Sequence, residues 1–140
     1  MKNTYLISTK VLDKVIHREK KTNGIFTVKS KKTGKDFTYK IGRSEYNGKW
    51  YTHVKVESMY MNFKYLGSYF NGKLKKKGEF INTPSAIAIA YVLKKIEEGK
   101  SELLDTQIEL MHMGKCVACG RPLTDSESIE RGLGPICDGI

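Results

Sequence analysis

Apolar and polar residues alternate with a period of two through residues 24–74, a pattern typical of strands in a sheet with one buried face. The alternating runs are separated by turn-forming segments, among them Asn47-Gly48 and Asn71-Gly72. Asn-Gly between two alternating runs is the strongest short signal for a β-hairpin. The sequence therefore predicts an antiparallel meander of four or five strands, with one apolar face and one solvated face.

Apolar residues recur at helical spacing on both sides of this meander. Before it, residues 4–8 are suited to a first strand, and residues 10–20 to a short helix, with a strand as the alternative. After it, Thr83 can cap a helix that begins at Pro84 and ends at Gly99. The apolar stripe of that helix is wide enough to cover the sheet. A second helix is expected over residues 102–113.

All three cysteines of the protein lie near its C-terminal end, and a histidine precedes them: His112, Cys116, Cys119 and Cys137. A C-x2-C pair lets two thiolates bind one tetrahedral ion from a single tight turn, and Gly120 suits that turn. A third thiolate and an imidazole would complete a closed Cys3His set. The pattern therefore predicts a structural zinc ion (Zn2+) as the cofactor.

Other interpretations of the cysteines remain open. A disulfide between Cys116 and Cys119 would close a very small loop, and a redox C-x-x-C is expected at the strand-to-helix turn of a βαβ unit, which the sequence does not predict here. The choice of the fourth ligand rests on spacing alone. Asp138, His53 or His17 could take the place of His112.

The residues between the second and third cysteines predict a short helix. Thr124 to Glu127 form a capping box, so the helix is expected to begin after Thr124. Gly132 can end it in a left-handed conformation, and Gly134-Pro135 can turn the chain back toward the metal. Since few apolar residues are available here, metal binding would supply the folding free energy, on the order of 10 kcal/mol.

The segment from Cys116 to Cys137 has the form C-x2-C-G-R-x-L-T-x3-S-I-x2-G-x-G-P-x-C. It resembles the C-terminal zinc-binding motif of a family of small phage and prophage proteins whose function is unknown. In that family a histidine just before the first cysteine corresponds to His112. The resemblance implies a zinc site and an origin in a mobile element, and it assigns no activity.

Charge divides the chain into two parts. Residues 1–100 carry 22 Lys and Arg against 8 Asp and Glu, whereas residues 101–140 carry 3 against 7. We therefore expect an α+β protein with two parts: a basic β-rich domain with its covering helix (residues 1–100), and a helix with a small Cys3His zinc module (residues 101–140). An acidic zinc module is poorly suited to phosphate contacts, so any nucleic-acid surface should lie in the first part.

The solvated face of the predicted sheet would gather basic and aromatic side chains. Lysines there can simply discourage pairing between sheet edges, but the excess of positive charge exceeds what solubility requires. We therefore predict that this surface binds nucleic acid, with Tyr51, Tyr60 and Tyr69 available to stack on bases. The predicted nucleic-acid-binding residues are Lys29, Lys40, Tyr51, Lys55, Lys64, Lys73, Lys75, Lys76 and Lys77.

These features favour a nucleic-acid-binding accessory protein without enzymatic activity, since no nucleophile–base pair, phosphate loop or carboxylate cluster is evident. The alternative is a phage-encoded inhibitor that binds a host defence protein, such as an anti-CRISPR acting on a nucleic-acid-guided nuclease. The partner would then be a host nucleoprotein complex. The longest apolar run is too short to span a bilayer, and few clustered cysteines suit a bacterial cytoplasm.

Overall fold

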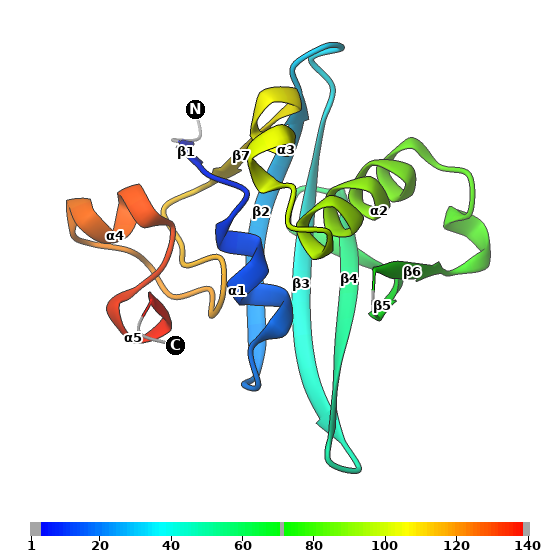
Figure 1. The fold of residues 1–140 in the computed structure, drawn as a ribbon, viewed down its shortest axis with the longest axis horizontal. Coiled ribbons are helices and arrows are strands. Elements are labelled where there is room, and N and C mark those ends of the chain that lie inside the picture. Colours follow the sequence, from blue (N-terminus) through cyan, green and yellow to red (C-terminus); the bar gives the residue numbers. More distant parts are fainter. Residues whose placement is uncertain (1–3, 71, 139–140) are drawn as a thin grey trace.

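The computed structural model describes residues 4–70 and 72–138, and its central feature is one antiparallel sheet (Figure 1). The strand order across the sheet is β1-β7-β2-β3-β4-β5-β6, with every neighbouring pair antiparallel. The strands are β1 (Tyr5–Ile7), β2 (Thr22–Ser30), β3 (Asp36–Tyr46), β4 (Lys49–Met59), β5 (Asn62–Phe70), β6 (Lys73–Lys76) and β7 (Ile108–His112). The predicted meander is confirmed as β2 to β6, and β7 and β1 extend it at the β2 side.

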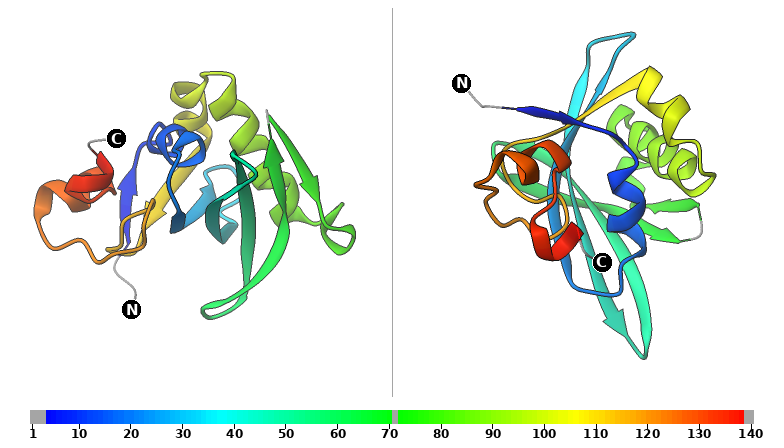
Figure 2. Two further views of the ribbon diagram at one scale, coloured as in Figure 1. Left: turned by 90° about the horizontal axis from the view of Figure 1, so that it is seen from below. Right: turned by 60° about the vertical axis from the view of Figure 1, so that its left-hand side comes forward.

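Helices pack on one face of this sheet (Figure 2). They are α1 (Val11–His17), α2 (Pro84–Glu97), α3 (Ser101–Gln107), α4 (Ser126–Arg131) and α5 (Pro135–Asp138), with a short 3-10 turn at Gly78–Phe80. The first three cover β2 to β5, whereas α4 and α5 lie beyond β1 with the chain that precedes them. Among the described residues, no helix is both long enough and apolar enough to cross a membrane.

The turn between β3 and β4 has the backbone that its Asn-Gly sequence predicts. Asn47 has φ 51° and Gly48 has φ 76°, so both central residues are left-handed, as in a type I′ hairpin. This turn fixes the register from Tyr46 opposite Lys49 to Tyr39 opposite Val56. A one-residue slip would move every apolar side chain of the strand to the solvated face, so the turn also determines which side chains enter the core.

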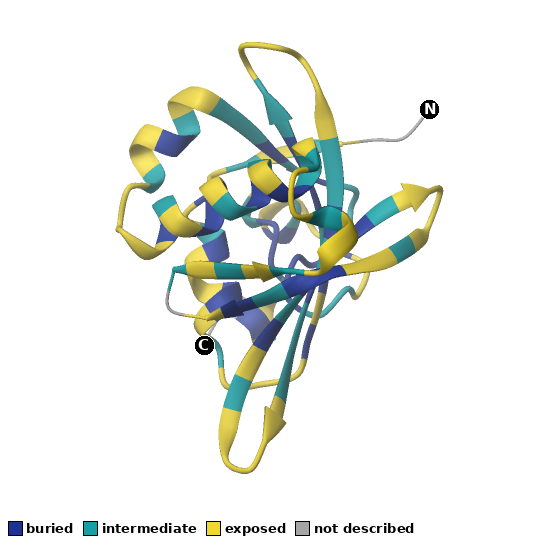
Figure 3. Ribbon diagram, turned by 90° about the vertical axis from the view of Figure 1, so that its right-hand side faces the viewer, coloured by how far each residue is buried: buried dark blue, intermediate teal, exposed yellow. Residues whose placement is uncertain are grey.

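The core lies between the sheet and the helices. Phe26, Tyr39 and Val54 from the sheet are fully buried against α1 and α2, where Leu12 and Leu93 are fully buried as well. Buried segments coincide with the middle of the strands, whereas the hairpin ends and the outer helix faces are exposed (Figure 3). At about 25 cal/mol for each Å² of apolar surface removed from water, this burial is the main stabilising contribution to the fold.

The helix α2 begins and ends as its sequence predicts. Thr83 accepts a hydrogen bond from the Ala86 backbone N–H, Pro84 takes the first helical position, and Gly99 beyond the last turn has φ 73°. Capping of this kind stabilises a helix by about 1 kcal/mol. The cap therefore sets where α2 crosses the sheet.

Two helix predictions were wrong in detail. Residues 102–113 do not form one helix: α3 ends at Gln107, and β7 pairs with β1 and β2. Pairing with two strands outweighs the helical spacing of this segment, because tertiary context overrides local propensity. The helix α4 is capped by Asp125, which accepts from the Ser128 N–H at 3.1 Å, and not by Thr124.

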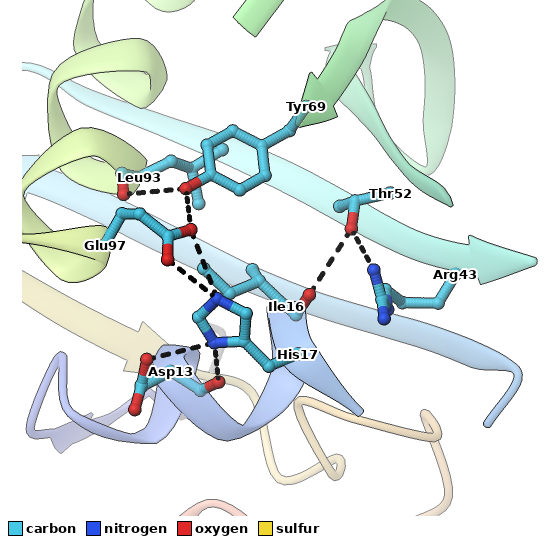
Figure 4. Close-up of polar contacts among 8 residues, drawn as sticks. All are labelled: Asp13, Ile16, His17, Arg43, Thr52, Tyr69, Leu93 and Glu97. Carbon is cyan, nitrogen blue, oxygen red and sulfur yellow. Dashed lines mark hydrogen bonds and ion pairs between the residues drawn. The ribbon is translucent and has the colours of Figure 1, made fainter. Parts of the chain in front are cut away.

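Polar contacts join α1 to α2 and to the sheet (Figure 4). His17 Nε2 lies 3.1 Å from both carboxylate oxygens of Glu97, and Tyr69 on β5 donates a hydrogen bond to the same carboxylate. Close by, Thr52 on β4 accepts from Arg43 and donates to the carbonyl of Ile16 at the end of α1. These contacts fix the end of α1, which leads directly to Arg18 and the cysteine cluster.

Candidate metal centre

The structure brings the three cysteines together. The sulfur atoms of Cys116, Cys119 and Cys137 all lie within 4.8 Å of one another, and the first and third residues are buried. Cys116 and Cys119 lie in the chain between β7 and α4, and Cys137 lies in α5. In a tetrahedral zinc site, Zn–S bonds of ~2.3 Å hold the sulfurs about 3.8 Å apart. The cluster therefore has the dimensions of a thiolate site that could hold a metal ion.

A tight turn presents the first two sulfurs on the same side. The Gly120 N–H donates to the Cys116 carbonyl at 2.9 Å, and Gly120 has φ 80°, which a residue with a side chain adopts at a cost. The backbone N–H groups of Ala118 and Gly134 point to the Cys116 sulfur at 3.4 and 3.5 Å. Such N–H groups stabilise a thiolate, which is the form that binds a metal.

The three sulfurs differ in their electrostatic surroundings. Burial opposes ionisation of Cys116, but hydrogen bonds from backbone N–H groups outweigh it, so the pKa of this thiol lies below its ordinary value. Burial, reinforced by hydrogen bonds with the other two cysteines, raises the pKa of Cys119 to about 11. Two of the three cysteines are buried, and a divalent ion bound among the sulfurs would favour their thiolate forms.

Arg18 adds a positive charge beside the cluster. Its Nη1 lies 3.4 Å from the Cys137 sulfur and comes from the residue that follows α1. A guanidinium here would offset the net negative charge of three thiolates on one divalent ion. No local spacing could have pointed to Arg18, because it lies 119 positions before Cys137 in the chain.

The structure does not bring His112 to the cysteine cluster. Its Nε2 lies 2.6 Å from the carbonyl of Ile129 in α4, and its Nδ1 accepts from the Gly114 N–H at 3.0 Å. These two contacts occupy both ring nitrogens and imply the tautomer with the proton on Nε2. The ring is fully buried and stacks on Tyr5 at 5.2 Å. His112 therefore joins β7, β1 and α4.

Two of the other proposed fourth ligands also lie away from the cysteines. His17 contacts Asp13 and Glu97, and His53 on β4 lies 2.9 Å from the Ser44 hydroxyl, so neither belongs to the cluster. Asp138 follows Cys137 at the end of α5, and its side chain is outside the described part of the structure. Among the described residues, the cysteines form the only group with metal-ligand geometry.

The cysteine turn packs directly on the sheet. The Asn23 N–H in β2 donates to the Ala118 carbonyl at 2.9 Å. A Cβ atom added to the neighbouring Gly24 would lie 1.5 Å from the Val117 carbonyl oxygen, so only glycine permits this approach. The cysteine turn is therefore seated against β2, and its position depends on the sheet.

The uncovered face of the sheet holds six of the predicted nucleic-acid-binding residues. Strand pairing places Lys40 opposite Lys55, and Lys55 opposite Tyr65, in one row across the sheet. The neighbouring row on the same face consists of Gly42, His53, Ser68 and Lys75. Lys40 lies over the ring of Phe63 at 5.7 Å. The six residues on this open face are Lys29, Lys40, Tyr51, Lys55, Lys73 and Lys75.

The remaining predicted residues lie elsewhere. Lys64 is opposite the buried Val56, and Lys76 is opposite Gly67, so both belong to the face that the helices cover. Lys77 follows β6 and lies 3.6 Å from a carboxylate oxygen of Glu79. Lys64 was expected on the open face, and the register places it on the other side, whereas Lys76 and Lys77 were expected only to extend the positive charge past the last hairpin. A register shift in β5 after Tyr65 and the alternation of side chains along β6 separate these lysines from that face.

Aromatic side chains on the open face also differ from the expectation. Tyr69 is buried under the helices and cannot stack on a base, whereas Tyr51, Tyr65 and Phe70 are exposed on the open face or its edge. Tyr65 and Phe63 alternate with Lys64, a signal that the sequence already contained. Tyr60 lies in the exposed turn between β4 and β5.

Comparison with known proteins bears only on the metal centre. Residues 111–140 match a family of unknown function, DUF6011, and this match covers the three cysteines and His112. No curated protein and no solved structure is significantly similar to the chain. The C-terminal segment is thus similar to an uncharacterised family.

Proposed function

We propose that this protein is a nucleic-acid-binding accessory protein that contains one structural zinc ion. The observation that carries the proposal is the open face of the sheet, where Lys40, Lys55 and Lys75 lie beside exposed aromatic rings. Lysines neutralise phosphates and release counterions, which supplies most of the affinity of a sequence-independent contact. The proposal includes no catalytic role for any residue.

Single-stranded nucleic acid suits this face best. Tyr51, Tyr65 and Phe70 are exposed by 36%, 40% and 64%, so their rings are accessible to unstacked bases. Base–aromatic stacking contributes about 1–3 kcal/mol per base, and single strands offer free base faces. Acidic residues reduce the charge at the other end of the face, where Asp36 lies opposite Lys29. Binding should therefore centre on β4, β5 and β6.

Zinc has a structural role in this proposal. Three thiolates would bind it between α5 and the cysteine turn, and the ion would supply the cross-link that holds this segment on β2. Residues 101–140 carry more acidic than basic side chains, so they repel phosphate. Three free cysteines suit a reducing cytoplasm, and the resemblance to phage and prophage proteins supports a mobile-element origin in a bacterial host.

The test is fluorescence anisotropy with 20-nucleotide single-stranded DNA and RNA. We expect the logarithm of the association constant to fall linearly with the logarithm of salt concentration, with a slope of roughly −0.7 per phosphate contact. Substituting Lys40→Gln, Lys55→Gln and Lys75→Gln together should reduce the slope by about 2. A matched triple variant on the helix side, Lys10→Gln, Lys94→Gln and Lys100→Gln, should retain it. Absence of binding at low salt, or equal loss in both variants, would refute the proposal.

A further inference from the structure

A groove lies on the helix-covered side of the molecule, where the β2–β3 hairpin extends beyond α2 and α3 (Figure 1). Its volume is about 800 Å³. The helices do not reach the end of the hairpin. Part of the apolar face of the sheet is therefore left uncovered between the hairpin and the side of α2. This surface is on the opposite side of the sheet from the lysines of the open face, and the proposed function does not use it.

The floor and one wall of the groove are apolar. Val28 and Phe37 pair across β2 and β3, and Ile108 begins β7 beside them. The wall is formed by α2, where Ile87 is 53% exposed and Tyr91 is 40% exposed. Large exposed apolar side chains on one continuous concave surface mark interaction sites more often than single exposed ones do. The groove therefore offers apolar contacts to a partner.

The rim of the groove is basic. Lys31, Lys32 and Lys35 stand at the turn of the β2–β3 hairpin, and none of the described residues that line the groove is acidic. The Nζ of Lys31 lies 2.8 Å from the backbone carbonyl of Asp105, which holds this side chain at the groove edge. Gln107, whose carbonyl accepts a hydrogen bond from the Lys31 N–H at 3.1 Å, also accepts one from the Tyr91 hydroxyl at 2.7 Å. Three positive charges thus border an apolar floor.

We propose that this groove binds an acidic amphipathic segment of a partner protein. Apolar side chains of the segment, spaced three and four residues apart, would fill the space between α2 and the hairpin, and its carboxylates would pair with the three rim lysines. Charge complementarity selects this occupant, because the same lysines repel a basic segment. A nucleic-acid strand is disfavoured, since its phosphates would have to cross an apolar floor that offers them no partner.

A phage-displayed library of random 12-residue peptides tests the proposal. The library is selected on the full-length metal-loaded protein after depletion on Ile87→Glu, which changes an exposed wall residue and should preserve the fold. Retained peptides are expected to carry Asp or Glu together with apolar residues at helical spacing. By fluorescence anisotropy, a synthetic peptide of this kind should bind Ile87→Glu at least about tenfold more weakly than the wild type.

A triple lysine variant and two control variants separate the contribution of charge from that of the apolar wall. Substituting Lys31→Glu, Lys32→Glu and Lys35→Glu together should abolish peptide binding at low salt, whereas Lys94→Glu and Ile81→Glu, which alter exposed residues outside the groove, should leave it unchanged. The proposal is overturned if no peptide prefers the wild type over Ile87→Glu. It is equally overturned if the retained peptides are basic, or if oleate occupies the groove and acidic peptides do not displace it.

Discussion

The sheet-and-helix body and the metal module (residues 113–138) are held together in different ways. The body has a continuous core that joins Phe26, Tyr39 and Leu93 across two layers. The module contributes only a few buried apolar side chains, including Val117 and Leu123, and surrounds three sulfur atoms. The body is stabilised by many small contacts, whereas the module would depend on the proposed metal–sulfur bonds and on its contact with β2. The two regions should therefore fail under different treatments.

The largest effect is expected from removing a sulfur ligand. Cys119→Ser, or treatment with a chelator, should release zinc and unfold residues 113–138, because metal binding supplies on the order of 10 kcal/mol to such a module. Hydrogen exchange measured by mass spectrometry should show loss of protection at Cys116 and Gly120, whose N–H groups are bonded within the turn, with α2 still protected. Thr124→Ala, an exposed change in the same module, is the control. If the module kept its full protection from hydrogen exchange without metal, the proposed difference between the two regions would be wrong.

A core substitution should act in the opposite way. Leu93 is fully buried in α2, so Leu93→Ala should lower the free energy of unfolding by ~2–5 kcal/mol. The denaturant midpoint of the whole body should fall, while elemental analysis below that midpoint still finds one zinc per chain. The adjacent Lys94→Ala is exposed and should change stability little. Loss of zinc from folded Leu93→Ala protein would mean that the two regions are not separable.

The contact between the regions can be tested at Gly24. Gly24→Ala would set a Cβ atom 1.5 Å from the Val117 carbonyl oxygen, so the module must move away from β2. Overpacking of this kind costs about 1–3 kcal/mol, occasionally more. The matched control is Gly42→Ala on β3, whose added Cβ comes no closer than 3.4 Å to another residue. Thermal unfolding followed by circular dichroism should separate the two variants, and equal midpoints would contradict the predicted seating.

The ligand set is tested by His112→Gln. Because both ring nitrogens of His112 already form hydrogen bonds, this variant should retain one zinc per chain by elemental analysis. Its free energy of unfolding should fall by about 1–3 kcal/mol, because the hydrogen bond to Ile129 is lost. Asp138→Asn is the companion variant. Substitution with Co²⁺ should give the spectrum of a tetrahedral thiolate site in His112→Gln. Release of metal from this variant would restore His112 as the fourth ligand.

The smallest expected effect is a dependence of stability on pH through Glu97. Hydrogen bonds from Tyr69 and His17 hold the pKa of Glu97 below its ordinary value. Because this pKa is lower in the folded than in the unfolded chain, the stabilisation is complete above about pH 4.5 and disappears as the pH falls through the folded-state pKa.

The Glu97 carboxylate is one-third exposed, so solvent screening keeps this contribution on the order of 1 kcal/mol or less. Urea unfolding at pH 7 and pH 3 should show a larger loss of stability for the wild type than for Glu97→Gln. Glu102→Gln, an exposed carboxylate on α3, serves as the control. An identical pH dependence in wild type and Glu97→Gln would show that the hydrogen bonds of Glu97 contribute nothing to stability.

Local signals in the sequence were sufficient for much of the fold. Asn47-Gly48 and the Thr83-Pro84 cap act within a few residues of where they occur, so the hairpin and α2 form as predicted. The segment Ile108–His112 has the composition of either a helix or a strand, and its pairing with β1 and β2 decides the outcome. That decision depends on residues about 80 to 105 positions earlier, which no local pattern reveals.

The same difference between local signals and distant contacts applies to the candidate site. The C-x2-C turn and Cys137 were recognisable because metal binding requires their spacing and chemistry. His112 had suitable spacing for a ligand, but its role depends on Ile129 and Gly114, which occupy its ring nitrogens. Likewise, the side of the sheet to which Lys64 belongs depends on a register shift in β5. Spacing can suggest a ligand, whereas three-dimensional contacts determine whether its nitrogens are available.

The pairing of β1 with β7 has a consequence for synthesis on the ribosome. Residues 5–7 are made before the described partner strand of this segment, residues 108–112, which follows about a hundred residues later. The hairpins of the meander can form as they emerge, because each joins neighbouring parts of the chain. The strand β1 must wait for this partner until residues 108–112 have been made. Its short length limits the opportunity for wrong association during that interval.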